Sequence, residues 1–186
     1  MTYRQKTNVR RIKFAREAGS VRRLHVHRII GEYDIAQHTY GALCLLRLLH
    51  PNPTIALTWA VLSHDKPERL TGDIPAPAKW QGGWFDRTQY ADLEDEILRG
   101  TGFKWDDLSL EEELWLTFVD SCEFYLFCLD QEMMGNKTLS RTKQLIFRYV
   151  DDQIRNFPPE CQDFWRDLMT EGWSMCEEIG EQDGRL

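Results

Sequence analysis

The amino-acid sequence predicts an all-α protein built as one helical bundle. Apolar residues recur every three or four positions in most of the long segments, which is the spacing of one face of an α-helix. Several of these segments begin at capping residues or prolines and end at glycines. The chain has 186 residues, enough for one well-buried core and too few for two comfortable domains. We therefore expect a single domain over 1–186.

The first 28 residues form a basic N-terminal segment. They carry nine Arg and Lys against one Glu, a net charge of +8, and because the whole chain carries −7 the remainder carries −15. A short helix is expected over 8–17. Such a segment could be a solvated amphipathic helix, an RNA-binding arm or a rim that attracts small phosphorylated molecules, and we favour the rim. Its densest anion-binding cluster comprises Arg22, Arg23, His25, His27 and Arg28.

The next two segments predict an antiparallel pair of helices. Residues 33–49 carry an apolar stripe that includes His38. The second helix is expected to begin with Asn52 as N-cap and Pro53 at its first position, and to end near His64. A short loop between them places the start of one beside the end of the other, so the two His should lie together. A His on an apolar stripe is, however, more often a satisfied core residue than a ligand.

The second half of the chain predicts a central helix with further helices around it. Ser109 followed by Glu112 is a capping box that begins the central helix. That helix is apolar on two sides, and Asp120 falls on the second, where an unpaired carboxylate would cost several kcal/mol. Asp120 therefore needs a cation, either a buried Arg or a metal ion. The helices of this half are expected over about 87–99, 109–135, 139–157 and 158–179, before a polar tail at 180–186.

Residues 64–79, HDKPERLTGDIPAPAK, place a His, three acids and two Lys where an apolar helix stops. His64 and Asp65 at a helix end can both reach one ion, although such a pair alone is more often a solvated helix end. The proline after them tolerates only the first turn of a new helix, so the bend should place Glu68 beside the ion without making it a ligand. The alternating prolines hold an extended stretch that presents Lys79 at a fixed distance from the acids. The ammonium group of Lys79, held near a metal ion, would suit the binding of a phosphate group.

This run resembles the signature of the HD-domain phosphohydrolases, in particular the 5′-deoxynucleotidase branch and the related phage dATP triphosphohydrolases. The resemblance spans about Arg23 to Asn136 and implies an HD-domain helical bundle. Leu24 stands where this family commonly has Trp, which leaves base selectivity open. The composition of the basic segment adds Arg22 as a substrate-binding candidate. The resemblance itself implies the metal ligands His38, His64, Asp65 and Asp120, the catalytic residues Glu68 and Asp73, and the substrate-binding residues Arg23, Leu24 and Lys79.

Two His and two carboxylates suit a borderline divalent ion such as Co²⁺, Mn²⁺, Zn²⁺ or Fe²⁺. Together with such an ion, the resemblance implies a metal-dependent hydrolase that removes phosphate or triphosphate from 2′-deoxynucleotides, with dATP and dAMP favoured. The alternatives are hydrolysis of a signalling nucleotide such as (p)ppGpp, and a non-catalytic nucleotide-binding protein. The intact Glu68 disfavours the second, because a purely structural metal site has no use for that acid.

Composition indicates the setting in which the protein works. No apolar run is long enough for a membrane span, and the N-terminus lacks a secretory signal, so a cytoplasmic location is expected, in the host if the gene is phage-encoded. Five Cys without C-x-x-C spacing are expected to be reduced core thiols. Tryptophans around residues 80–105 could stack on a base, but core filling is favoured. The expected partner is a small deoxynucleotide rather than a stable nucleic-acid complex, and a homo-oligomer is expected.

Overall fold

The computed structural model of the chain describes residues 7–75 and 86–173. Within these ranges every regular element is a helix, and the isolated β-bridge between Arg22 and Asp34 is the one extended pairing. The all-α prediction is confirmed. The helices are α1 Asn8–Gly19, α2 Ile35–Leu49, α3 Ile55–Ser63, α4 Glu68–Thr71, α6 Arg87–Thr101, α7 Leu110–Met133, α8 Ser140–Gln153, the 3₁₀ turn η1 Ile154–Asn156 and α9 Pro159–Glu171.

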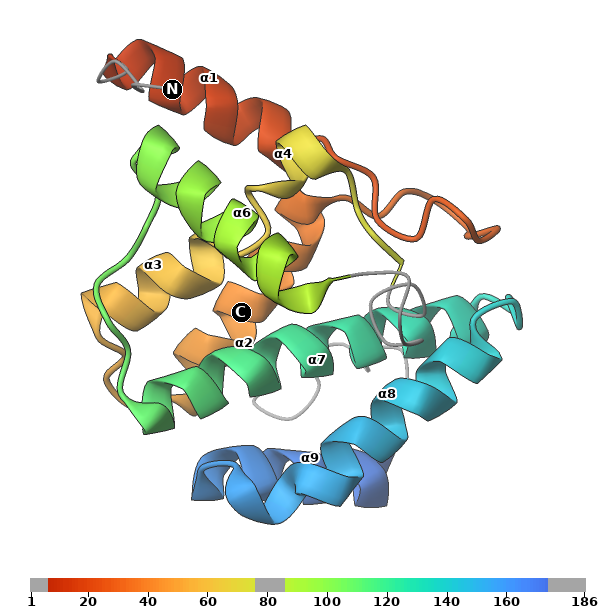
Figure 1. Ribbon diagram of the computed structural model, residues 1–186. Helices are drawn as coiled ribbons and strands as arrows, with labels where there is room; N and C mark the ends of the chain where they lie inside the picture. Colours follow the sequence, from red (N-terminus) through yellow and green to blue (C-terminus); the bar gives the residue numbers. More distant parts are fainter. Residues whose placement is uncertain (1–6, 76–85, 174–186) are drawn as a thin grey trace, which may run out of the picture.

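The long helix α7 is the centre of the molecule. It crosses the middle of Figure 1, with α8 and α9 on one side and α6 and α1 on the other, and it packs directly on α2, α3 and α8. Its start is the predicted capping box, in which Ser109 and Glu112 bond each other's backbone N–H groups. The main apolar core surrounds it, because one face of α7 buries Trp115, Phe118, Val119 and Cys122 at no more than 1% exposure.

A second, smaller apolar cluster holds the N-terminal helix in place. Phe14 of α1 packs with Ile97 and Leu98 of α6 and with Phe103 just after it. Trp59 and Trp105 pack against this cluster, so Trp105 fills core space, as favoured from the sequence. Trp80 and Trp84 lie outside the described residues.

Three predicted helix boundaries differ from the structure. The helix α3 begins at Ile55, because Thr54 rather than Asn52 is the N-cap and its Oγ1 accepts a hydrogen bond from the Leu57 N–H at 3.0 Å. The helix expected over 139–157 tightens into the 3₁₀ turn η1 after Gln153. The last helix ends at Glu171 and not at 179, because Gly172 leaves helical geometry with φ of 79°.

No helix in the two described stretches combines the length and the apolar character that crossing a membrane requires.

Candidate metal centre and adjoining cavity

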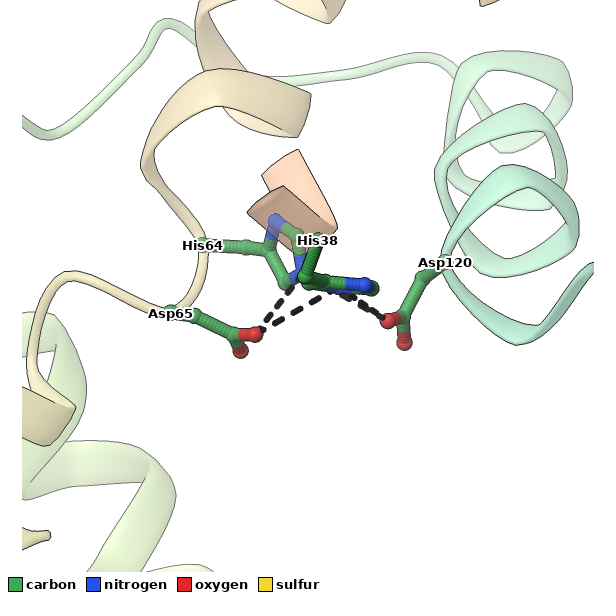
Figure 2. Close-up of side chains that lie close together, drawn as sticks. All are labelled: His38, His64, Asp65 and Asp120. Carbon is green, nitrogen blue, oxygen red and sulfur yellow. Dashed lines mark ion pairs between the residues drawn. The ribbon is translucent and has the colours of Figure 1, made fainter. Parts of the chain in front are cut away.

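Four side chains from three helices meet at one point. His38 comes from the first turn of α2, His64 and Asp65 follow the end of α3, and Asp120 comes from the middle of α7 (Figure 2). One possible ligand atom from each lies within 4.8 Å of all the others. The Nε2 atoms of both His lie 3.5 Å from Asp65 Oδ2, and they lie 3.0 and 3.6 Å from Asp120 Oδ1.

Local sequence signals hold the backbone of this cluster. Asp34 caps α2, and its Oδ1 accepts the Gln37 N–H at 2.8 Å, so that His38 falls in the first turn. At the end of α3 the chain bends through tight turns, and the N–H of Glu68 bonds the carbonyl of Asp65 at 3.0 Å. The predicted bend between α3 and α4 is therefore present, with Pro67 as the residue before the short helix.

Both imidazoles turn the same ring nitrogen toward the centre. His64 Nδ1 donates to the carbonyl of Val61 at 3.0 Å, which turns Nε2 toward the cluster. His38 Nδ1 contacts Glu123 and lies 3.2 Å from the Tyr33 hydroxyl. Within the described part of the chain, the two Nε2 atoms are buried without a hydrogen-bond partner. Two buried imidazole nitrogens facing two carboxylates are a donor set that a divalent cation satisfies, so the residues fit a metal ion.

The charged groups of the cluster shift one another's pKa values. Burial works to raise the pKa of Asp120, but the imidazoles of His38 and His64, which face its carboxylate, hold it well below its usual value. Burial likewise opposes the lowering of the Asp65 pKa by His64 and Arg23. For His64, burial lowers the pKa, yet Asp65 and Asp120 raise it to about 9, so a metal ion that binds here has to displace a proton from Nε2. The two carboxylates are therefore ionised, which is the state that binds a cation.

A cavity of about 500 Å³ opens beside the cluster. His64, Asp65 and Asp120 line it, together with Arg23 and Glu68. A second part of its wall is apolar and comes from α7 and α8, with Leu116, Phe124, Leu145, Ile146 and Tyr149. The second apolar side of α7 that the sequence indicated is thus partly a cavity wall, since Leu116 and Phe124 are only half-buried.

The structure places two of the predicted substrate-binding residues at this cavity. The guanidinium of Arg23 pairs with Asp65 and lies 5.6 Å from the ring centre of Tyr33 and 5.9 Å from that of Phe124. Leu24 also lines the cavity and has a φ of 56°, a left-handed conformation that is costly for a branched side chain.

The predicted catalytic residues occupy different positions. Glu68 is 3% exposed at the start of α4 and faces the cavity. Asp73 also lines the cavity, but its Oδ2 accepts the Leu24 N–H at 2.9 Å and lies 3.6 Å from His25. Asp73 thus supports the loop that carries Arg23 and Leu24.

The structure does not bring every predicted residue to the centre. Arg22 pairs with Glu32 at the surface, both side chains being at least 70% exposed, and it does not line the cavity. Lys79 lies outside the described residues. Sequence reasoning also missed three residues: Tyr33 and Glu123 behind His38, and Arg87 on the cavity wall. Glu123 alone had a signal, because it follows Asp120 by three positions in an otherwise apolar stretch.

Comparisons with known proteins give one informative similarity. No protein-family model and no curated protein matches the sequence. Among solved structures, the chain is similar to the cyanophage S-2L HD phosphohydrolase DatZ, bound to dA and one catalytic Zn²⁺ ion. The two share 19% sequence identity and a TM-score of 0.63, over 89% of this chain and 94% of that one. The chain therefore has the fold of an HD phosphohydrolase, as its HD signature implied.

Proposed function

We propose that this HD-fold chain is a metal-dependent phosphohydrolase that acts on 2′-deoxynucleotides, releasing phosphate or triphosphate from substrates of the dAMP or dATP kind. The observation that carries the proposal is the cluster of two His and two Asp at the wall of a cavity that also presents Arg23 and Glu68. A structural metal site is normally closed by its ligands, whereas this one borders open space where a substrate can bind.

His38, His64, Asp65 and Asp120 would hold the metal. A mixed nitrogen and oxygen donor set suits Zn²⁺, Co²⁺, Mn²⁺ or Fe²⁺. When bound, such an ion lowers the pKa of a water molecule and neutralises charge at phosphorus. The similar DatZ structure supports Zn²⁺ as one such ion, because that protein carries a catalytic zinc.

Arg23 and Glu68 supply the remaining chemistry. The Arg23 guanidinium is beside Asp65, so it can bind phosphate oxygens next to the metal through paired hydrogen bonds. Burial works to lower the pKa of Arg23, but Asp65 and other nearby acids outweigh this effect. The pKa is therefore above its usual value, and the guanidinium stays charged. Glu68 lines the same cavity without belonging to the four-residue cluster, which suits a group that orients the attacking water and accepts its proton.

The cavity favours a nucleotide over a simple phosphate ester. Its volume of about 500 Å³ falls in the range of sites for small organic ligands. Its polar cluster suits the phosphate, and the apolar side chains of α7 and α8 suit a base and a sugar. Leu24 on the cavity wall can cover a sugar face that lacks the 2′-hydroxyl. The structurally similar DatZ binds dA, which has such a sugar. Arg87 offers a second cation for further phosphates.

A substrate panel tests the proposal. Protein loaded with each candidate metal is incubated with dNMPs, dNTPs, NTPs and (p)ppGpp, and chromatography identifies the nucleoside and the released phosphate, pyrophosphate or triphosphate. We expect deoxynucleotides to be hydrolysed fastest, and Asp65→Ala to abolish the activity. Preferential hydrolysis of (p)ppGpp would establish the signalling alternative, and no turnover of any nucleotide with any metal would refute the proposal.

A further inference from the structure

Glu123 is a buried acid that the proposed chemistry does not use. It lies on α7 and is 8% exposed, and its neighbours along the helix are the core residues Cys122 and Tyr125. Its Oε2 accepts a hydrogen bond from the Tyr33 hydroxyl at 2.6 Å and contacts His38 Nδ1. Glu123 therefore reaches the face of His38 that is turned away from the metal cluster.

The geometry points to Glu123 as a positioning residue for the metal centre, acting through His38. With its Nδ1–H donated to Glu123, the imidazole keeps the Nε2 lone pair free, and that atom lies 3.0 Å from Asp120 Oδ1. A carboxylate behind a ligating His both fixes the ring orientation and makes the imidazole a stronger ligand. This inference rests on the proposed metal centre and adds a residue that positions one of its ligands.

Tyr33 holds the carboxylate in place. Its ring is 1% exposed and stacks on Phe127 with centroids 3.8 Å apart and planes 12° apart. A ring so packed has one position for its hydroxyl, and that hydroxyl donates to the same Glu123 oxygen that meets His38. The Glu123 carboxylate is therefore aimed by a rigid partner.

Gly41 provides the space that the carboxylate needs. It lies on α2 one turn after His38, and a Cβ added there would lie 2.7 Å from Glu123 Cγ and 2.9 Å from its Oε1. Contacts that short do not occur for real side chains, so any residue larger than glycine would displace Glu123. Glycine weakens a helix interior, and its presence in the middle of α2 is explained by this close approach.

Metal affinity in the absence of nucleotide tests the inference. Competition with a chromophoric chelator gives the Kd for Zn²⁺ or Co²⁺ of the folded wild type, Glu123→Gln, Gly41→Ala and Tyr33→Phe. We expect affinity to fall about 10- to 100-fold in Glu123→Gln and Gly41→Ala, as for other supports of ligating His residues, and less in Tyr33→Phe. The matched controls are Glu132→Gln and Gly19→Ala. Glu132 lies on α7, as Glu123 does, and its replacement affects only a pairing with Lys143 and Ser140 of α8. A Cβ at Gly19 would meet Ala36 instead. Both should bind metal as the wild type does.

A second readout separates positioning from a merely structural role. If Glu123 only stabilised the fold, its replacement would lower the melting temperature of the metal-free protein and leave the metal Kd of folded molecules unchanged, and that result would overturn the inference. Nitrogen NMR of His38 should show the proton on Nδ1 in the wild type and a mixture of tautomers in Glu123→Leu. A wild type that binds metal but hydrolyses no nucleotide would contradict the proposed function alone, whereas a wild type without metal affinity would overturn both.

Discussion

Glu68 is the residue at which metal binding and chemistry can be separated. It is buried at the start of α4 and lines the cavity, yet it lies outside the four-residue cluster. We predict that Glu68→Gln lowers turnover by about 10²-fold or more, because a group that handles the proton is lost, while the metal content is unchanged. Steady-state kinetics and elemental analysis of the same preparation measure both. Turnover at the wild-type rate would move the proton transfer to another group, with Asp73 the first candidate.

Arg23 and Arg22 are neighbours in sequence with different surroundings. Arg23 is half-buried beside Asp65, whereas Arg22 is exposed and paired with Glu32. Arg23→Ala should lower kcat/KM by about 10- to 100-fold for both dAMP and dATP, since a charge-assisted hydrogen bond to a shared phosphate is lost. Arg22 can attract the substrate only through long-range electrostatics. Arg22→Ala should therefore lower kcat/KM by less than Arg23→Ala does, for dATP only, and the loss should shrink with added salt. Equal losses in the two variants would contradict this assignment.

Some residues of the candidate site could be predicted from the sequence, and others could not. The HD signature and the apolar setting of Asp120 indicated the four side chains that the structure brings together. Tyr33 and Glu123 escaped notice because their role depends on how α2 packs against α7, and helical spacing does not specify which residue faces a distant ring. For the same reason the surface pairing of Arg22 with Glu32 could not be foreseen from a basic cluster.

At the level of elements, α7 anchors the loop that precedes α2. Gln131 is fully buried, and its side chain bonds both the N–H and the carbonyl of Ile30, at 2.8 and 2.9 Å. We predict that Gln131→Met lowers the free energy of unfolding by about 1–3 kcal/mol, because these backbone groups lose their partner. The loop carries Arg23, so KM should rise as well. Denaturant unfolding and kinetics check the two effects against Gln153→Met, whose side chain bonds only its own helix. Unchanged stability in Gln131→Met would mean that water replaces the side chain.

The helix boundaries show which local signals are reliable. The capping box at Ser109 begins α7 as predicted, because both of its bonds are made within four residues. Asn52 and Thr54 are both good caps, and the structure selects Thr54, whose hydroxyl also bonds Glu112 of α7. The choice between two adequate caps was thus decided by a contact with a residue far along the chain.

For the whole molecule, the buried thiols offer a chemical test of the packing. Cys122, Cys128 and Cys161 are fully buried, and burial raises the pKa of Cys128 to about 12 and those of the other two further. Only Cys44 among the described Cys is partly accessible. Alkylation of the native protein, mapped by mass spectrometry, should modify Cys44 and spare these three until denaturant is added. Rapid native modification of Cys122 would show that the core around α7 is loosely packed.

The all-α architecture was the most predictable feature, because helical periodicity can be read directly from the sequence. The cavity was not predictable, since it arises where α7, α8 and the loop before α2 leave space between them. In the proposed function, this space is where the substrate binds beside the four-residue cluster.

In the function proposed for this chain, His38, His64, Asp65 and Asp120 form one metal centre on which hydrolysis depends. The most direct measurement is a titration of metal-free protein with Zn²⁺, Co²⁺ or Mn²⁺ while the release of product from dATP and dAMP is followed. We predict no hydrolysis without metal and a rise in rate that levels off at about one ion per chain, with no recovery in Asp120→Ala. Full activity of the metal-free protein, or equal activation of Asp120→Ala, would contradict the account.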